Sequence, residues 1–221
     1  MKKKVLGLVL VGLLFLSVGC SSKEAQEFKR EYESLNGTSN KSGKEHRTVN
    51  INKNNPFLKA SASDILTKLE NKETFYVYFG DKLCPWCRSV IEKCIEVANK
   101  NKVKKIYYVA IWDDEGNEIL RDKYERKNGV SSKVKDGTVE YYKLLEAFDN
   151  VLNPYTYTHS DGREDTFGEK RIYAPNFIYV KDGEAVKMTE GISQKQSDAR
   201  GELTEEILKD EEEMFTEFFN N

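Results

Sequence analysis

Hydrophobic and polar residues follow patterns that predict alternating strands and helices from residue 47 onward. The short alternating stretch Arg47–Ile51 and the apolar runs Thr74–Gly80 and Lys104–Trp112 predict three strands, of which the last two are buried. Between them, apolar residues recur at helical spacing in Ser61–Glu73 and in Pro85–Asn99. This order predicts βαβ units, and therefore an α/β domain with a mostly parallel core sheet.

The C-terminal part of the chain predicts a hairpin followed by a helix. Asn176–Val180 and Ala185–Thr189 have the pattern of two strands, and an Asp-Gly turn lies between them. The final stretch, Leu203–Phe219, is amphipathic, and Thr204 stands in the N-cap position. The apolar side of this helix is expected to pack on the sheet.

Residues 113–170 separate these two regions and are interpreted as an insertion. Val139–Leu152 carries apolar residues at helical spacing, so we expect the insertion to be mainly helical. The stretch that begins at Asn153 is expected to be a loop. Two roles remain open: a lid or specificity surface beside the functional site, or an elaboration that only covers the sheet edge.

The first 46 residues do not follow the globular pattern. A basic start is followed by the uncharged apolar run Val5–Gly19, which is the order of a secretory signal peptide, predicted for residues 1–19. The run is shorter than the roughly 20 residues of a membrane-spanning helix. Residues 20–46 are first charged, where a short helix could form, and then rich in Gly, Ser, Asn and Lys. Together they predict a flexible tether before a domain over 47–221.

The end of the apolar run, Leu16–Cys20, resembles the lipobox of bacterial lipoproteins, with Ser17 where Leu is usual. The resemblance implies that Cys20 is lipidated and holds the chain on the extracytoplasmic face of the cell membrane. An uncleaved anchor and plain secretion are the alternatives. Each of the three places the domain outside the cytoplasm, where disulfides persist.

Charge gives no indication of a nucleic-acid partner. The chain has 35 Lys and Arg against 37 Asp and Glu in 221 residues, a net charge of -2. Nucleic-acid binding would call for a surplus of basic residues.

The cysteines favour redox chemistry over metal binding. Setting Cys20 aside leaves three, of which Cys84 and Cys87 form a C-x-x-C pair. A zinc site needs four ligands, and His46 and His159 are the only histidines, so no second pair completes a site. A disulfide-stapled scaffold would have more cysteines, in even number. We therefore expect no metal.

The position of the pair assigns different roles to the two thiols. Cys84 is expected at the N-cap of its helix, with Pro85 at the first helical position. Backbone N–H groups and the positive end of the helix dipole lower the pKa of a thiol placed there. Cys84 is thus the exposed nucleophile, and Cys87, one turn later on the inward side, is the resolving thiol.

Other residues near the motif have two readings each. The third cysteine, Cys94, is roughly 10 Å along the helix from Cys87, too far for a disulfide. We expect a buried apolar thiol, and a redox role is the alternative. Trp86 is either a platform that faces the substrate or a packing residue. Lys82 and Arg88 either stabilise the thiolate or are solvated surface charges.

The strand, C-x-x-C, helix and strand, followed by "YAPNFIYVKDGE" and the last helix, resemble the thioredoxin-like superfamily. The resemblance covers about 47–112 and 171–221. It implies a central mixed sheet flanked by helices, with Pro175 as a cis-proline that faces the cysteines. It also implies that the backbone of Ala174 pairs with an extended substrate segment.

The chain departs from that family at several positions. A buried Asp that relays protons from the resolving thiol stands six residues before the first cysteine in thioredoxins, and here the residue is Tyr78. Leu83 replaces the Trp that is usual before the motif, and Pro-Trp occupies its centre. A finer resemblance is to exported thioredoxin-like lipoproteins of Gram-positive bacteria, including bacteriocin transport accessory proteins.

Together these features predict a membrane-anchored, extracytoplasmic thiol–disulfide oxidoreductase that acts on protein thiols and disulfides. Its redox group is the Cys84–Cys87 disulfide, without a further cofactor, and a membrane electron donor or oxidant is the expected partner. Whether it reduces, oxidises or isomerises stays open. The alternative is a non-catalytic accessory or binding lipoprotein with the same fold, related to secretion or to bacteriocins.

Overall fold

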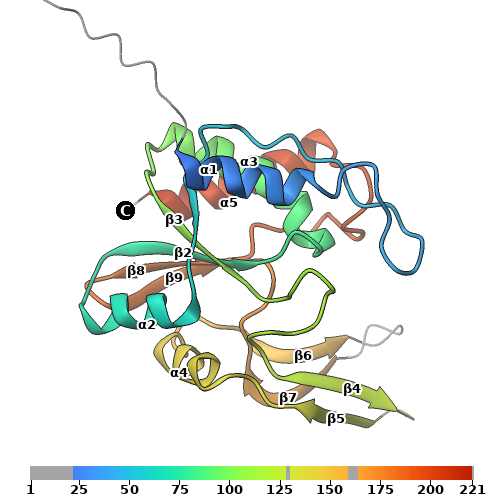
Figure 1. The fold of residues 1–221 in the computed structure, drawn as a ribbon, viewed down its shortest axis with the longest axis vertical. Coiled ribbons are helices and arrows are strands. Elements are labelled where there is room, and N and C mark those ends of the chain that lie inside the picture. The colour runs from blue at the N-terminus through green and yellow to red at the C-terminus, as the bar shows by residue number, and fades with distance from the viewer. Residues whose placement is uncertain (1–21, 128–129, 159–163, 221) are drawn as a thin grey trace, which may run out of the picture.

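The computed structural model describes residues 22–127, 130–158 and 164–220 (Figure 1). The signal peptide, the lipobox with Cys20, and His159 lie outside these ranges. Within them, no helix is both long enough and apolar enough to cross a membrane.

Five strands form the central sheet. Their spatial order is β1 (Phe57–Lys59), β3 (Ile106–Ala110), β2 (Phe75–Gly80), β8 (Asn176–Lys181) and β9 (Glu184–Thr189). Strands β1 and β2 run parallel to β3, whereas β8 runs antiparallel to both β2 and β9. The chain is therefore an α/β protein with a mixed central sheet.

Helices cover both faces of this sheet (Figure 1). One face carries α1 (Lys23–Glu33), α3 (Pro85–Lys100) and α5 (Glu205–Phe219), and the other carries α2 (Ala62–Glu70) and α4 (Val139–Ala147). Because side chains alternate along a strand, Tyr78 enters the core beneath α1, α3 and α5, while Val77 and Phe79 enter the other core. Each face thus has its own hydrophobic core.

The helix starts follow from local chemistry. Ser61 and Asp64 form a capping box at α2, in which each side chain accepts a hydrogen bond from the other residue's backbone N–H. At α5 the Thr204 side chain accepts the N–H of Ile207 at 3.4 Å, which confirms the predicted N-cap. The helices predicted over 61–73, 85–99 and 203–219 are confirmed.

The strand predicted at Arg47–Ile51 is wrong, since the first strand is β1. Val49 and Ile51 are buried, which explains the strand-like pattern. Side chains take the place of a neighbouring strand here: Asn36 bonds both the N–H and the carbonyl oxygen of Val49, and the N–H of Ile51 donates to Glu33. The segment is extended without belonging to a sheet.

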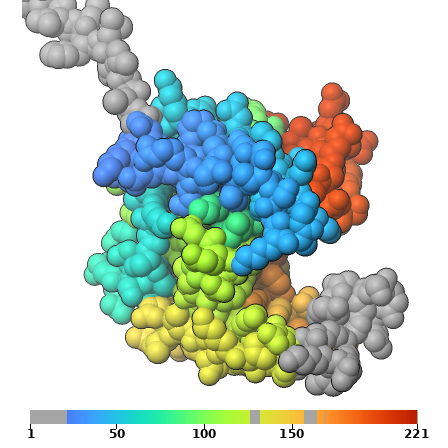
Figure 2. Space-filling model, turned by 45° about the vertical axis from the view of Figure 1, so that its right-hand side comes forward, coloured from blue at the N-terminus to red at the C-terminus, as the bar shows by residue number. Residues whose placement is uncertain are grey.

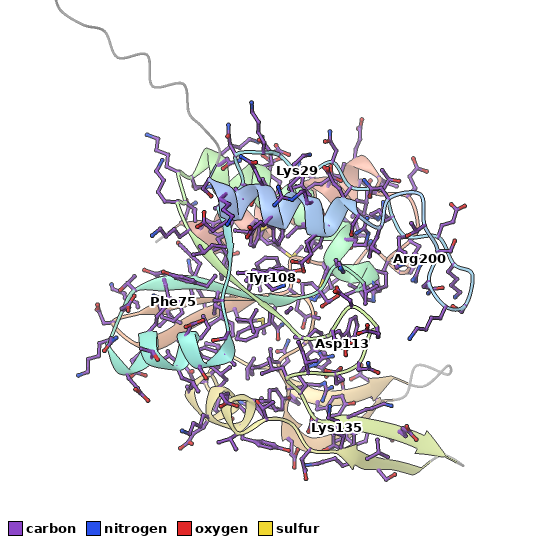
Figure 3. The ribbon with its side chains drawn as sticks, in the orientation of Figure 1. Lys29, Phe75, Tyr108, Asp113, Lys135 and Arg200 are labelled. Atoms are coloured by element: carbon purple, nitrogen blue, oxygen red, sulfur yellow. The ribbon has the colours of Figure 1, made fainter. Side chains whose placement is uncertain are left out.

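The flexible tether predicted over 20–46 is also contradicted for the described residues, 22–46. Helix α1 packs on the sheet with Ala25, Phe28 and Tyr32 buried, and Phe28 stacks on Phe57 with ring centroids 4.3 Å apart. These three residues form a narrow apolar stripe within a strongly charged segment. Tyr108, labelled in Figure 3, donates from below to Glu31 of this helix at 2.9 Å.

The insertion is not mainly helical. Its described part contains α4 and two antiparallel ribbons, formed by β4 (Lys123–Lys127) with β5 (Val130–Lys135) and β6 (Pro154–Thr158) with β7 (Glu164–Lys170). The two strands of each ribbon pair only with one another and bury little surface. They therefore contain few apolar residues and show no clear alternation of apolar and polar positions. In Figure 2 the insertion forms the lower part of the molecule, opposite the N-terminal segment.

Candidate functional site

Cys84 begins α3 directly after the central strand β2. It is the N-cap residue, and its sulfur accepts the backbone N–H of Cys87 at 3.4 Å. Pro85 fills the first helical position, where its missing N–H costs no hydrogen bond. The backbone N–H of Cys84 donates to the carbonyl oxygen of Asp81 at 3.2 Å, which fixes the turn between strand and helix. The predicted N-cap position is confirmed.

The Cys84 thiol faces the start of β8. Its sulfur donates to the carbonyl oxygen of Ala174 at 3.3 Å, and the Ala174–Pro175 peptide bond is cis. Ala174 is half-buried and Pro175 is buried. The fold therefore brings together the two segments that the sequence pointed to, although they are far apart along the chain.

The two motif cysteines are both buried. Cys84, expected to be exposed, has only 4% of its surface accessible, and Cys87 has none. Trp86, Trp112 and Ala174 pack against the core cluster that contains both thiols, which explains the low exposure of Cys84. Both cysteines are free thiols.

Electrostatics separates the two thiols in the predicted sense. The pKa of Cys84 is lowered, first because the Cys87 thiol donates a hydrogen bond to its sulfur and further because the backbone N–H groups of Cys87 and Trp86 point at it. Burial raises the pKa of Cys87 well above its ordinary value. Of the two thiols, Cys84 is thus the one that loses its proton more readily.

Arg121 adds a positive charge that also lowers the pKa of Cys84. This nearly buried guanidinium pairs with Glu118 and donates at 3.2 Å to the carbonyl oxygen of Ile172, just before Ala174. These contacts connect Glu118 and Arg121 of the insertion to the segment from Ile172 to Pro175, which faces the Cys84 thiol. Arg121 was not predicted from the sequence, because it lies in the region interpreted as a helical insertion.

Tyr78 lies next to Cys87 in the core beneath α1, α3 and α5. Its hydroxyl group hydrogen-bonds the Cys87 sulfur and lies 2.8 Å from the hydroxyl of Tyr32 on α1. Tyr78 was singled out in the sequence as a departure from a family pattern. Its partner Tyr32 was missed, since it falls in the predicted tether.

Asp81 is a buried acid beside the motif that was not predicted from the sequence. It is 2% exposed, and its carboxylate accepts the backbone N–H groups of Leu83 at 2.9 Å and Trp112 at 3.3 Å. Burial raises its pKa to about 6, against the lowering effect of these two hydrogen bonds. An Asp that directly follows a buried strand and precedes the motif was the available signal.

Lys82 and Arg88, the charged residues that flank the motif, interact with groups other than the thiols. Lys82 forms an ion pair with Asp114 at 2.7 Å. Arg88 is completely buried, so the reading as a solvated charge is wrong for this residue. Trp86 is half-buried against the core, and Cys94 is fully buried with its pKa raised by that burial, which confirms the expected apolar environment of this thiol.

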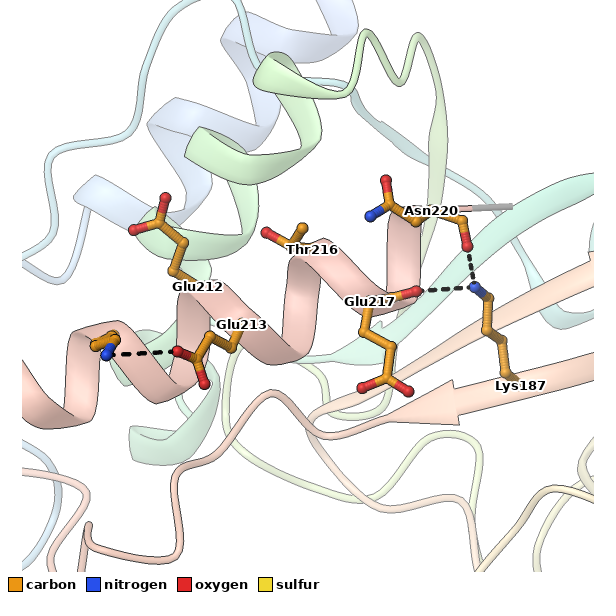
Figure 4. Close-up of a pocket in the computed structure, with 7 residues that line it drawn as sticks. Lys187, Glu212, Glu213, Thr216, Glu217 and Asn220 are labelled. Carbon is orange, nitrogen blue, oxygen red and sulfur yellow. Dashed lines mark hydrogen bonds and ion pairs between the residues drawn. The ribbon is translucent and has the colours of Figure 1, made fainter.

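In the described part of the chain, neither the surface hollows nor the metal-ligating side chains point to a further functional site. One hollow lies over α5 and β9, around Lys187, Glu213 and Thr216, and no cysteine lines it (Figure 4). A second hollow adjoins the motif and is lined by Leu83, Trp112 and residues of the 35–46 segment. Of the residues that the structure describes, no three His, Cys, Asp or Glu side chains are grouped so as to hold a metal ion.

Comparison with protein-family models and with curated proteins finds no match for this chain.

Proposed function

We propose that the chain is a thiol–disulfide oxidoreductase of the thioredoxin-like superfamily, in which Cys84 is the nucleophile and Cys87 is the resolving thiol. The observation that carries this proposal is the position of Cys84: its sulfur caps α3, lies beside the Cys87 thiol, and contacts the carbonyl oxygen of Ala174. A low-pKa thiol with a second thiol one turn away is the arrangement that disulfide exchange needs.

The reaction has two steps. The Cys84 thiolate attacks one sulfur of a substrate disulfide, and the other substrate sulfur leaves and takes up a proton. Cys87 then loses its proton and attacks the Cys84 sulfur, which breaks the mixed disulfide and releases the second substrate thiol. Two electrons pass to the substrate, and the Cys84–Cys87 disulfide remains. In reverse, the same steps oxidise a substrate dithiol.

The surroundings of Cys84 support a polypeptide substrate. The backbone of Ala174 lies next to the reacting sulfur, where it would pair with an extended segment that brings a substrate sulfur to Cys84. Trp86, half-buried and directly after Pro85, would contact the same segment. These two residues and Pro175 are the proposed substrate-binding residues.

The proposed location is the extracytoplasmic face of the cell membrane, with a lipid on Cys20 and a membrane electron donor or oxidant as partner. In this arrangement the attachment is short, because α1 begins at Lys23, only three residues after Cys20. The globular domain would then lie close to the membrane surface, within reach of a redox partner in the membrane.

The test is reduction of insulin by the purified full-length chain in the presence of dithiothreitol. Cys84→Ser should abolish the activity, whereas Cys94→Ser, which changes a buried thiol of the same helix, should retain it. Equal activity of Cys84→Ser and the parent would show that the catalytic assignment is wrong. Absence of any exchange in the parent would favour the accessory or binding protein.

The reduction potential of the Cys84–Cys87 pair distinguishes the directions. A value near about -270 mV is that of a thioredoxin-like reductant, and one near about -120 mV is that of a strong oxidant. Equilibration of the full-length chain with glutathione buffers measures it.

A further inference from the structure

Two tyrosine hydroxyl groups meet beside the resolving thiol in the core between α1, α3 and the sheet. Tyr32 comes from α1 and Tyr78 from β2, and their hydroxyl oxygens are 2.8 Å apart. Both side chains are completely buried. The Tyr78 hydroxyl also hydrogen-bonds the sulfur of Cys87. The three groups therefore form one hydrogen-bonded chain inside the protein.

The direction of this chain is set by its hydrogens. Each hydroxyl has a single hydrogen to donate, and a thiolate can only accept. When Cys87 is ionised, the hydrogen of Tyr78 must therefore point to the sulfur. The Tyr78 oxygen then accepts from Tyr32. Both hydroxyls are satisfied in this state, and both stabilise the negative sulfur.

The positions of the two tyrosines are fixed by their neighbours. The Tyr78 ring stacks on Phe177 at 4.5 Å and on Tyr108 at 5.5 Å between centroids. The backbone carbonyl oxygen of Tyr32 accepts a hydrogen bond of 2.7 Å from Arg88, the residue after Cys87. Tyr32 is thus held at its backbone by the motif helix and at its hydroxyl by β2.

Few other polar groups around Cys87 can donate a hydrogen bond to its sulfur, so the Tyr78 hydroxyl is an important donor for a Cys87 thiolate. On its own helix, Cys87 donates to Cys84, and the Arg88 guanidinium turns to carbonyl oxygens. From the turn before the helix, the backbone N–H of Asp81 donates to the Cys87 sulfur, while the carboxylate of Asp81 is taken up by backbone N–H groups. Forming a thiolate in this buried site costs free energy because water is excluded, so each hydrogen-bond donor to the sulfur stabilises it appreciably.

We propose that Tyr78, held in place by Tyr32, is a positioning residue for the resolving step, and that α1 is thereby part of the redox centre. The proposal rests on the proposed function. As Cys87 loses its proton to the departing substrate sulfur, the Tyr78 hydroxyl donates to the forming thiolate and keeps its own proton. Burial raises the pKa of Tyr78 well above its ordinary value, which is consistent with a donor that does not ionise.

The test follows a single turnover of the reduced full-length chain with glutathione disulfide, quenched with acid and read by mass spectrometry. The first step gives the mixed disulfide between Cys84 and glutathione, and the second step, attack by Cys87, removes it. In Tyr78→Phe the first step should keep its rate. The second should slow about tenfold at neutral pH, with its pH profile moved upward by about one unit.

Two further variants separate the hydroxyl contact from general packing. Tyr32→Phe should give a smaller slowing of the second step, because Tyr78 still reaches the sulfur. Tyr108→Phe is the matched control, since this buried ring lies in the same cluster but its hydroxyl donates to Glu31, and it should leave the second step unchanged. Thermal unfolding of each variant reports whether it folds.

The possible failures are distinguishable. An unchanged second step in Tyr78→Phe, or an equal slowing in Tyr108→Phe, would overturn the inference and leave the proposed function standing. Absence of the mixed disulfide in the parent would instead overturn the proposed function. In that case the pH dependence of the Cys87 ¹³Cβ chemical shift, in Cys84→Ser with and without Tyr78→Phe, still tests the contact: an identical titration in both would refute it.

Discussion

Arg88 donates a hydrogen bond of 2.7 Å to the backbone carbonyl oxygen of Tyr32 and so joins α3 to α1. The guanidinium has no exposed surface, and its other bonds go to the carbonyl oxygens of Arg47 and Lys82 and to the side-chain oxygen of Asn36. These acceptors replace the water that a buried cation loses. One side chain of the motif helix thus orders much of the segment between residues 32 and 47.

Substituting Arg88 by Met should destabilise the protein. The variant leaves the carbonyl oxygens of Tyr32 and Arg47 without their donors inside the protein, so we expect the free energy of unfolding to fall by about 3 kcal/mol. Urea unfolding measures the change. Arg30→Met is the control, since this side chain on α1 is 66% exposed and should alter stability little. Equal urea midpoints for Arg88→Met and the parent would show that the hydrogen bonds of Arg88 do not stabilise the fold.

Gly80→Ala should disturb Tyr78, the tyrosine beside Cys87. A Cβ atom on Gly80 would lie 2.1 Å from the Tyr78 hydroxyl oxygen, so the ring must move. We expect a loss of about 2 kcal/mol in the free energy of unfolding, as in other overpacked cores. The control is Gly201→Ala, where the added atom meets nothing closer than 3.3 Å.

A double-mutant cycle attributes that loss to the ring. When Tyr78→Val has already removed the aromatic side chain, the added methyl group of Gly80→Ala should cost clearly less than in the parent, because the two residues are in contact. Urea unfolding of the four proteins gives the coupling. Equal costs in both backgrounds would mean that the clash with Tyr78 does not arise.

The motif helix and the last helix were predictable because each has a strong local signal. Cys84 and Pro85 mark the start of α3, and Thr204 marks that of α5, in both cases followed by an apolar stripe. The contact between Cys84 and Ala174 could be expected only through the family resemblance, since nothing local links these two segments.

The errors have physical causes of their own. A short charged helix was one possibility for the start of the segment 20–46, but its packing on the sheet was missed, because charged residues outnumber Ala25, Phe28 and Tyr32, the stripe that becomes buried only when the sheet is present. The two ribbons of the insertion bury little, so their strands have no clear hydrophobic period. The role of Arg88 was not readable either, because its acceptors are backbone carbonyl groups, which every residue has.

Removing the second thiol should weaken the first as a nucleophile. The hydrogen bond from the Cys87 thiol is the largest cause of the lowered pKa of Cys84. In Cys87→Ala we therefore expect the pKa of Cys84 to rise by about one unit, with alkylation about tenfold slower at neutral pH. Cys87→Ser keeps a donor at this position and should show a smaller rise. The pH dependence of iodoacetamide modification of Cys84 measures both.

Glu211 on α5, away from the two motif cysteines, is expected to couple stability to pH. It has no exposed surface, and among the described residues neither of its carboxylate oxygens has a hydrogen-bond partner. Burial raises its pKa to about 7, against the attraction of Lys93 and Arg47. The folded protein thus holds this proton more tightly than the unfolded chain, in which Glu titrates near its ordinary value of about 4.3.

Glu211→Gln should therefore flatten the pH dependence of stability. In the parent, the free energy of unfolding falls as pH rises through the window from the unfolded to the folded pKa, by up to about 3 kcal/mol from this group, and stays low above it. The variant cannot ionise here, so it should match the parent near pH 4 and be more stable at pH 8. Urea unfolding at both pH values measures this, with the exposed Glu213→Gln as control. If the difference between Glu211→Gln and the parent is the same at both pH values, Glu211 does not ionise while buried.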